Sequence, residues 1–246
     1  MKLQAVIFDW AGTTVDYGSN ATVVVLENLF SKEGISLGAE ELRHAVGLPK
    51  LDQIREIFAL EQVIEAWQQQ HGKPPEDADC LRVYQGFEAV ALEVLPDQIT
   101  VIPGVAEVVE RLRERDFKIG STTGYSRKLI EVIRKEAAAD GYEPDTIVTP
   151  DETLGVGRPA PWMAFENLRL LDVYPPQLCL KVGDTPADMH EGRNAGMITV
   201  GVIESSNETV KGGAQYAREV LAEAGADFLI GTMEELFEVI GEIENG

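Results

Sequence analysis

Short apolar segments alternate with helical patterns along most of this 246-residue chain. The first of them, Ala5–Phe8, is apolar at every position, which is typical of a strand buried on both faces of a sheet. Further strands are predicted at 117–122, 146–148, 178–182 and 198–202, with helices at 105–115, 126–140, 162–171 and 234–244. This alternation predicts an α/β fold with a doubly wound parallel sheet.

The alternation is interrupted between residues 20 and 98, where the pattern is helical throughout. Helices are predicted there at 21–33, 51–59, 63–71 and 79–95. We therefore expect an α/β core formed by residues 1–19 and 99–246, with an inserted α-helical cap domain at residues 20–98. The polar stretch 204–207 and the glycine pair 212–213 are expected to be surface loops.

The chain carries 42 acidic and 21 basic side chains, a formal net charge of −21. Nucleic acids and anionic membranes are bound through clustered lysine and arginine, so this charge argues against both as partners. It does not exclude a small phosphorylated ligand held at one local cationic site. The two cysteines, Cys80 and Cys179, have no metal-binding spacing, and we expect buried reduced thiols. With no signal-like or membrane-spanning apolar segment, a cytoplasmic protein is expected.

Polar side chains follow several of the predicted strands. Asp9, Thr123 and Asp184 each come at the end of one, and Arg158 lies in a short loop between glycine and proline. Ligands of doubly wound sheets bind outside the carboxyl ends of the strands, so these side chains are expected to lie close together. Two carboxylates at neighbouring strand ends suit Mg²⁺. Asp188, four residues after Asp184, is then placed to hold a metal-bound water.

Each of these residues also has an ordinary structural explanation. Asp9 is a common type of turn cap, Thr123 and Gly124 form a polar turn, and Arg158 can be a solvated surface cation. Taken together, however, two carboxylates, a hydroxyl with exposed backbone N–H groups, and a cation describe phosphoryl transfer.

The order of these residues resembles the four motifs of the haloacid dehalogenase superfamily: DWAGTT at 9–14, STTG at 121–124, GRP at 157–159 and GDTPAD at 183–188. The resemblance implies a Rossmann-like core with an inserted cap. It makes Asp9 the nucleophile that forms an aspartyl phosphate. It implies that Mg²⁺ is held by Asp9, Asp184 and the backbone carbonyl of Ala11, and that Thr123 and Arg158 anchor the phosphate or the aspartate.

One departure from that pattern is informative. Phosphatases of the superfamily carry a second aspartate two residues after the nucleophile, where this chain has Ala11. Alanine cannot protonate a leaving alkoxide, so an ordinary phosphate ester is disfavoured as substrate.

Longer segments resemble the phosphonatase family; these segments lie at 9–18, 47–50, 119–125, 157–163, 181–185 and 191–197. Members of that family hydrolyse phosphonoacetaldehyde to acetaldehyde and phosphate. The resemblance makes Lys50 the amine that forms a Schiff base with the aldehyde, an electron sink that permits cleavage of the carbon–phosphorus bond. It places Ala11, Gly12, Gly124 and Tyr125 beside the phosphonate. It also implies a homodimer through the cap.

This chain differs from the phosphonatase pattern near Lys50. Gln53 stands where the family has a histidine, Val46 where it has a methionine, and Ser19 near the place of a cysteine. A glutamine cannot shuttle protons as an imidazole does, which leaves the proton route around Lys50 open. Tyr125 and His44 are candidates for that role.

Two other functions remain possible from the sequence. One is a phosphatase or phosphomutase of the same superfamily, which Ala11 disfavours. The other is a non-catalytic phospho-acceptor domain that uses Asp9 and Asp184 as response regulators do, for which a cap of this size is unnecessary.

Overall fold

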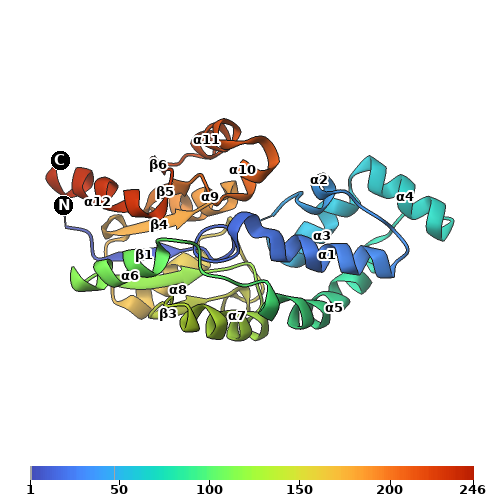
Figure 1. Cartoon of the computed structure of the whole chain (residues 1–246), viewed down its shortest axis with the longest axis horizontal. Helices are drawn as coiled ribbons and strands as arrows, with labels where there is room; N and C mark the ends of the chain where they lie inside the picture. Colours follow the sequence, from blue (N-terminus) through green and yellow to red (C-terminus); the bar gives the residue numbers. More distant parts are fainter. Residues whose placement is uncertain (1, 47) are drawn as a thin grey trace.

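A six-stranded parallel sheet forms the centre of the computed structural model, which describes residues 2–46 and 48–246 (Figure 1). The spatial order of the strands is β3-β2-β1-β4-β5-β6. Their bounds are β1 Ala5–Phe8, β2 Lys118–Thr122, β3 Thr146–Val148, β4 Cys179–Gly183, β5 Ile198–Val202 and β6 Phe228–Ile230. The strand order reverses at β1, which pairs with both β2 and β4, so the topological switch point lies beside the end of β1.

Helices cover both faces of this sheet because successive side chains of a strand point to opposite sides. In β1, Val6 and Phe8 belong to one hydrophobic cluster, whereas Ala5 and Ile7 belong to another. The helices of the core are α6 Val105–Glu114, α7 Arg127–Ala139, α8 Trp162–Leu171, α9 Pro186–Ala195, α10 Asn207–Gly212, α11 Ala214–Glu223 and α12 Leu236–Asn245. The predicted α/β fold with a doubly wound parallel sheet is therefore confirmed.

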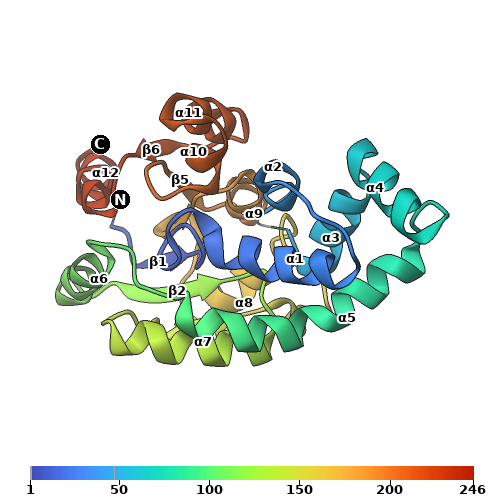
Figure 2. The same cartoon turned by 45° about the vertical axis from the view of Figure 1, so that its right-hand side comes forward.

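Five helices between β1 and α6 form a helical insert beyond one end of the sheet (Figures 1 and 2). Their bounds are α1 Asn20–Lys32, α2 Ala39–Leu42, α3 Lys50–Phe58, α4 Glu61–His71 and α5 Asp77–Val94. Phe58 packs against both Phe30 and Trp67, with ring centroids 5.3 and 4.8 Å apart. These aromatic contacts join α1, α3 and α4 into one unit.

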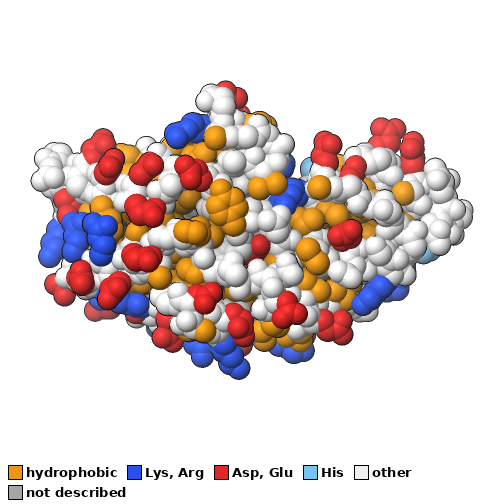
Figure 3. All heavy atoms as spheres, in the orientation of Figure 1, with side chains coloured by type: hydrophobic (Ala, Val, Ile, Leu, Met, Phe, Trp, Pro, Cys, Tyr) orange, Lys and Arg blue, Asp and Glu red, His pale blue; other side chains and the backbone are white. Residues whose placement is uncertain are grey.

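Short 3₁₀ helices complete the chain: η1 Tyr17–Ser19, η2 Leu95–Asp97, η3 Pro150–Thr153, η4 Pro176–Leu178 and η5 Met233–Glu235. The first two lie at the two connections between insert and core. Cys80 and Cys179 are free and buried, as expected. Among the residues described, no helix combines the length and the apolar character needed to cross a membrane. Figure 3 shows acidic side chains spread across one face, with lysine and arginine confined to small groups.

One expectation about the surface is wrong. Residues 204–207 were expected to form an exposed loop, but Ser205, Ser206 and Asn207 are buried. Their polar side chains are hydrogen-bonded inside the core, Ser205 to the carbonyl of Gly12 and Ser206 to the carbonyl of Asp184. Burial is tolerated because these groups are paired.

Candidate active site

A small cavity, here called the chamber, lies where the insert meets the carboxyl end of β1. Its volume is about 20 Å³. It is lined by Asp9, Ala11, Ser19, Thr22, Val46, Lys50, Thr123, Gly124, Tyr125, Arg158 and Thr185. Seven of the residues predicted from the sequence line this space, and the remaining three, Gly12, Asp184 and Asp188, lie around Asp9.

Asp9 is the first residue after β1 and is buried. Its backbone N–H donates to the carbonyl of Val182 at 2.9 Å, which continues the pairing of β1 with β4. Its Oδ1 lies 2.9 Å from Nη2 of Arg158. Burial raises the pKa of Asp9, while the charge of Arg158 acts in the opposite direction. The parallel sheet thus presents one carboxylate at its centre, facing the insert.

Three carboxylates form a buried cluster beside the chamber. Oxygens of Asp9, Asp184 and Asp188 all lie within 4.8 Å of one another. Asp184 accepts hydrogen bonds from the Thr13 hydroxyl at 2.9 Å and from the backbone N–H of Asn207 at 3.1 Å. Burial raises the pKa of Asp184 well above its usual range, and the negative charges of Asp9 and Asp188 add to the increase. A cluster of hard oxygen ligands under this repulsion is suited to a divalent cation.

Two buried cations contact this cluster, and one of them was not predicted. Arg158 pairs with both Asp9 and Asp188. Lys181, from the middle of β4, lies 3.0 Å from Asp188 and 3.1 Å from Glu191. When all of them are ionised, the three aspartates and Glu191 carry two more charges than Arg158 and Lys181, an excess that a divalent cation would balance.

The sequence contained a signal for Lys181 that was missed. A lysine in the middle of an otherwise apolar strand is buried only where it is paired. Its two partners, Asp188 and Glu191, lie in the next helix, α9. They are three residues apart and therefore on the same face of that helix.

Gly12 brings the backbone close to Asp184. A Cβ at this position would lie 2.4 Å from Oδ2 of Asp184, and the φ of 85° favours glycine. The N–H of Gly12 donates to the carbonyls of Val15 and Asp16, at 2.8 and 3.1 Å. The predicted contact between Gly12 and a phosphonate therefore cannot use this N–H, and the visible role of the glycine is to make room for Asp184.

Lys50 enters the chamber from the insert as the first residue of α3. Its Nζ donates to Oε1 of Gln53 at 3.2 Å and lies 5.0 Å from the centre of the Tyr125 ring. Nε2 of Gln53 donates in turn to the carbonyl of His44 at 3.4 Å, which orients the amide. Burial lowers the pKa of Lys50 to about 8, assisted by the charge of Arg158.

The two candidate proton carriers near Lys50 have other partners. The Tyr125 hydroxyl lies 2.8 Å from that of Thr22, and burial raises the pKa of Tyr125, which keeps the phenol protonated at neutral pH. The His44 ring is 42% exposed and lies beside Glu56, 4.0 Å from its carboxylate. Neither geometry favours proton transfer to Lys50.

Two polar atoms in the lining of the chamber have no hydrogen-bond partner among the residues described. They are the hydroxyl of Ser19 and Nε of Arg158, and both are buried. Buried polar groups in proteins are normally paired, so unpaired ones at a cavity indicate a polar ligand.

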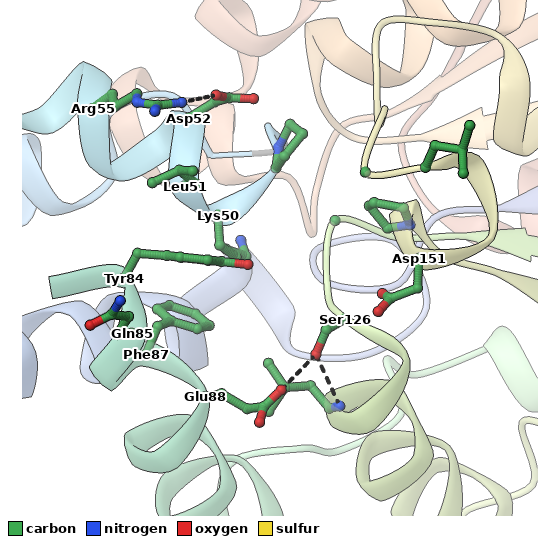
Figure 4. Close-up of a pocket in the computed structure, with 16 residues that line it drawn as sticks. Lys50, Leu51, Asp52, Arg55, Tyr84, Gln85, Phe87, Glu88, Ser126 and Asp151 are labelled. Carbon is green, nitrogen blue, oxygen red and sulfur yellow. Dashed lines mark hydrogen bonds and ion pairs between the residues drawn. The ribbon is translucent and has the colours of Figure 1, made fainter. Parts of the chain in front are cut away.

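A second cavity, here called the cleft, opens between the insert and the core (Figure 4). Its volume is about 710 Å³. Tyr84 and Glu88 line it from the insert and Asp151 from the core. Lys50 and Gly124 line both the cleft and the chamber, so Lys50 lies at the boundary between them.

Comparison with known proteins identifies the family. Residues 3–196 match the haloacid dehalogenase-like hydrolases. The chain is 46% identical to a phosphonoacetaldehyde hydrolase of Bacillus cereus over 260 residues and 44% identical to one of Bacillus cytotoxicus over 258 residues. Each match covers 99% of this chain and 97% of the relative.

Among solved structures, a phosphonoacetaldehyde hydrolase like protein from Oleispira antarctica superposes with a TM-score of 0.95 at 32% identity. This alignment covers 100% of the present chain and 94% of the other. The catalytic-site arrangement and these similarities lead to one conclusion: the chain belongs to the phosphonoacetaldehyde hydrolase family of haloacid dehalogenase-like hydrolases.

Proposed function

We propose that this protein hydrolyses the carbon–phosphorus bond of phosphonoacetaldehyde to acetaldehyde and phosphate, through a Schiff base on Lys50 and an aspartyl phosphate on Asp9. One observation carries the proposal: an amine and a carboxylate line the same chamber, where residue 11 is an alanine that offers no acid. A carbon leaving group stabilised by an imine needs no such acid. The names of the relatives support the substrate.

The first step is condensation of Lys50 with the aldehyde. Only the neutral amine is nucleophilic, and a pKa of about 8 leaves roughly a tenth of Lys50 neutral at pH 7. The amine nitrogen forms a bond to the carbonyl carbon. The carbonyl oxygen leaves as water with one proton from the amine and one from solvent, and a protonated imine remains. The hydrogen bond to Gln53 orients Nζ for this attack.

The second step is attack of Asp9 on phosphorus. An oxygen–phosphorus bond forms, the carbon–phosphorus bond breaks, and its electron pair moves into the protonated imine to give a neutral enamine on Lys50. Arg158 contacts Asp9 and has a free Nε, so it can hold both the nucleophile and a phosphonate oxygen. Thr123, Gly124, Tyr125 and the unpaired hydroxyl of Ser19 complete the lining.

The carboxylates of Asp9 and Asp184 and the carbonyl of Ala11 are the residues that would hold Mg²⁺. Bound there, the ion offsets the repulsion between the Asp9 carboxylate and the phosphonate dianion. Asp188, which Arg158 and Lys181 keep ionised, fixes Arg158 and can hold a metal-bound water.

The last steps restore the free side chains. Water attacks the aspartyl phosphate, which frees the Asp9 carboxylate and leaves phosphate bound beside it. The enamine takes a proton at its terminal carbon to become an imine, and water hydrolyses that imine to acetaldehyde and Lys50. Gln53 cannot carry these protons, so we assign them to water that reaches Lys50 from the cleft.

The test is acetaldehyde release from phosphonoacetaldehyde, followed with coupled alcohol dehydrogenase, with and without Mg²⁺. We expect Mg²⁺-dependent release by the wild-type protein. The matched variant Lys50→Arg keeps the positive charge but cannot form an imine, and it should release none. Acetaldehyde release by this variant would refute the imine step.

We also propose that residues 20–98 act as a cap on the core and that the protein is a cytoplasmic homodimer joined through this cap. Leu81, on α5, is 38% exposed and offers an apolar contact on the cap. The buried free thiols of Cys80 and Cys179 are compatible with a reducing compartment. Light scattering of the purified protein measures the oligomeric state directly.

A further inference from the structure

Arg43 is a buried arginine of the insert that bonds to three residues in two other parts of the chain. It follows α2 and is 6% exposed. Its guanidinium donates to the carbonyl of Gly18 and to Oδ1 of Asn20, both at the entrance to the insert. It also donates to Oδ1 of Asn207, the first residue of α10 in the core, at 3.0 Å. One side chain therefore joins the insert, its entry connection and the core.

Asn207 links this arginine to Asp184. Its Nδ2 donates to Glu208 at 3.2 Å, which fixes the amide so that Oδ1 accepts from Arg43. Its backbone N–H donates to Oδ2 of Asp184 at 3.1 Å. The preceding residue, Ser206, donates to the carbonyl of Asp184 at 2.8 Å. A movement of Asn207 is thus passed directly to the carboxylate and the backbone of Asp184.

The entry connection has an uncommon backbone conformation. Asp16, Gly18 and Ser19 have positive φ values of 55°, 72° and 53°. For the two non-glycine residues this conformation is strained and persists only where neighbours enforce it. The N–H of Gly18 donates to the carbonyl of Ser205 at 2.8 Å, so the core holds this connection from the other side.

We propose that Arg43 is a positioning residue that couples closure of the insert to the geometry of Asp184. Its bonds to the entry connection hold the insert against the core, and its bond to Asn207 holds the N–H that orients the Asp184 carboxylate. The planar fork of a guanidinium can reach these acceptors at once, whereas a lysine amine cannot. This role rests on the metal-binding part of the proposed function.

The test compares Arg43→Met with Arg82→Met, which removes an exposed arginine of the same insert that pairs with Glu33 and Asp79. Mg²⁺ binding is measured by calorimetry without substrate, and hydrogen exchange is measured at the amides of residues 16–21. Removing a partner of a metal ligand weakens metal binding by about 10- to 100-fold. Arg43 acts through Asn207, so we expect about tenfold weaker binding and faster exchange for Arg43→Met, with neither change for Arg82→Met.

A second variant keeps the test decisive if Arg43→Met does not fold. Asn207→Ala retains the backbone N–H and removes the acceptor of Arg43, and it should weaken Mg²⁺ binding to a similar extent. The double variant should bind Mg²⁺ no more weakly than either single variant, because the two substitutions remove the same Arg43–Asn207 interaction. Arg43→Lys should recover part of the affinity. Unchanged Mg²⁺ affinity in both single variants, or additive losses in the double variant, would overturn the coupling.

These measurements require no phosphonate. A wild-type protein that binds Mg²⁺ but releases no acetaldehyde would therefore refute the proposed reaction and leave the coupling intact. A wild-type protein that does not bind Mg²⁺ would overturn the coupling.

Discussion

Raising the pH from 6 to 10 titrates the amine of Lys50, and the structure predicts where the change occurs. Burial and the charge of Arg158 lower the pKa of Lys50 from 10.5 to about 8. At pH 7 an amine with the lower pKa is about 9% neutral, against about 0.03% for an ordinary lysine. Imine formation at Lys50 should therefore be about 300-fold faster than at an ordinary lysine of equal intrinsic reactivity. It should rise tenfold per pH unit below 8 and level off above it.

The assay traps the imine with borohydride after short exposure to acetaldehyde, which the proposed reaction releases on Lys50. Peptide mass spectrometry then reports how much of Lys50 carries the reduced adduct at each pH, and Lys50→Arg gives the background. The midpoint is expected near pH 8. Trapping at Lys50 that still rises tenfold per unit between pH 9 and pH 10 would refute the argument that burial and Arg158 lower this pKa.

Three further substitutions test other parts of the site. The raised pKa of Asp184 means that its ionised form destabilises the metal-free fold as the pH rises above the ordinary carboxylate range. With a chelator present at pH 7, the melting temperature of Asp184→Asn should therefore be higher than that of the wild type. Added Mg²⁺ should stabilise the wild type but not this variant. A lower melting temperature of the variant in chelator would contradict the proposed repulsion between the carboxylates. Gln53→Leu removes the acceptor 3.2 Å from Lys50 and should slow imine trapping up to about tenfold, so an unchanged rate would exclude the orienting role. Lys181→Met leaves the buried carboxylate of Glu191 without its cationic partner and should cost about 3–5 kcal/mol in denaturant unfolding. The matched change Lys128→Met, at an exposed ion pair, should cost less than about 1 kcal/mol, and equal costs would show that burial of the pair is unimportant.

The sheet could be predicted because its strands are short, apolar and bounded by polar residues. The predicted strands at 5–8, 146–148 and 198–202 have the bounds observed, and those at 117–122 and 178–182 differ by one residue at an end or at both ends. β6 was missed because it has three residues at the edge of the sheet, too few for a periodic pattern. Position at a strand end was also sufficient to bring Asp9 and Asp184 together.

The contacts around these residues could not be predicted in the same way. The stretch from 204 to 207 has the composition of a surface turn, yet its hydroxyls are buried. They bond to the carbonyls of Gly12 and Asp184, and these contacts become visible only once the fold brings three distant segments together. Polar residues are buried wherever every donor finds an acceptor, and a local pattern contains no information about distant acceptors.

The position of Lys50 between two cavities has a consequence for the order of product release. Asp9 and Arg158 line the chamber and not the cleft, whereas Lys50 lines both. In the proposed reaction the aldehyde end of the substrate therefore lies toward the cleft and its phosphorus toward Asp9 and Arg158. Acetaldehyde has the direct exit and leaves first, while phosphate stays against Asp9 and Arg158 and leaves last. Phosphate is then the product that can bind to the free enzyme, and we expect it to inhibit competitively with the substrate.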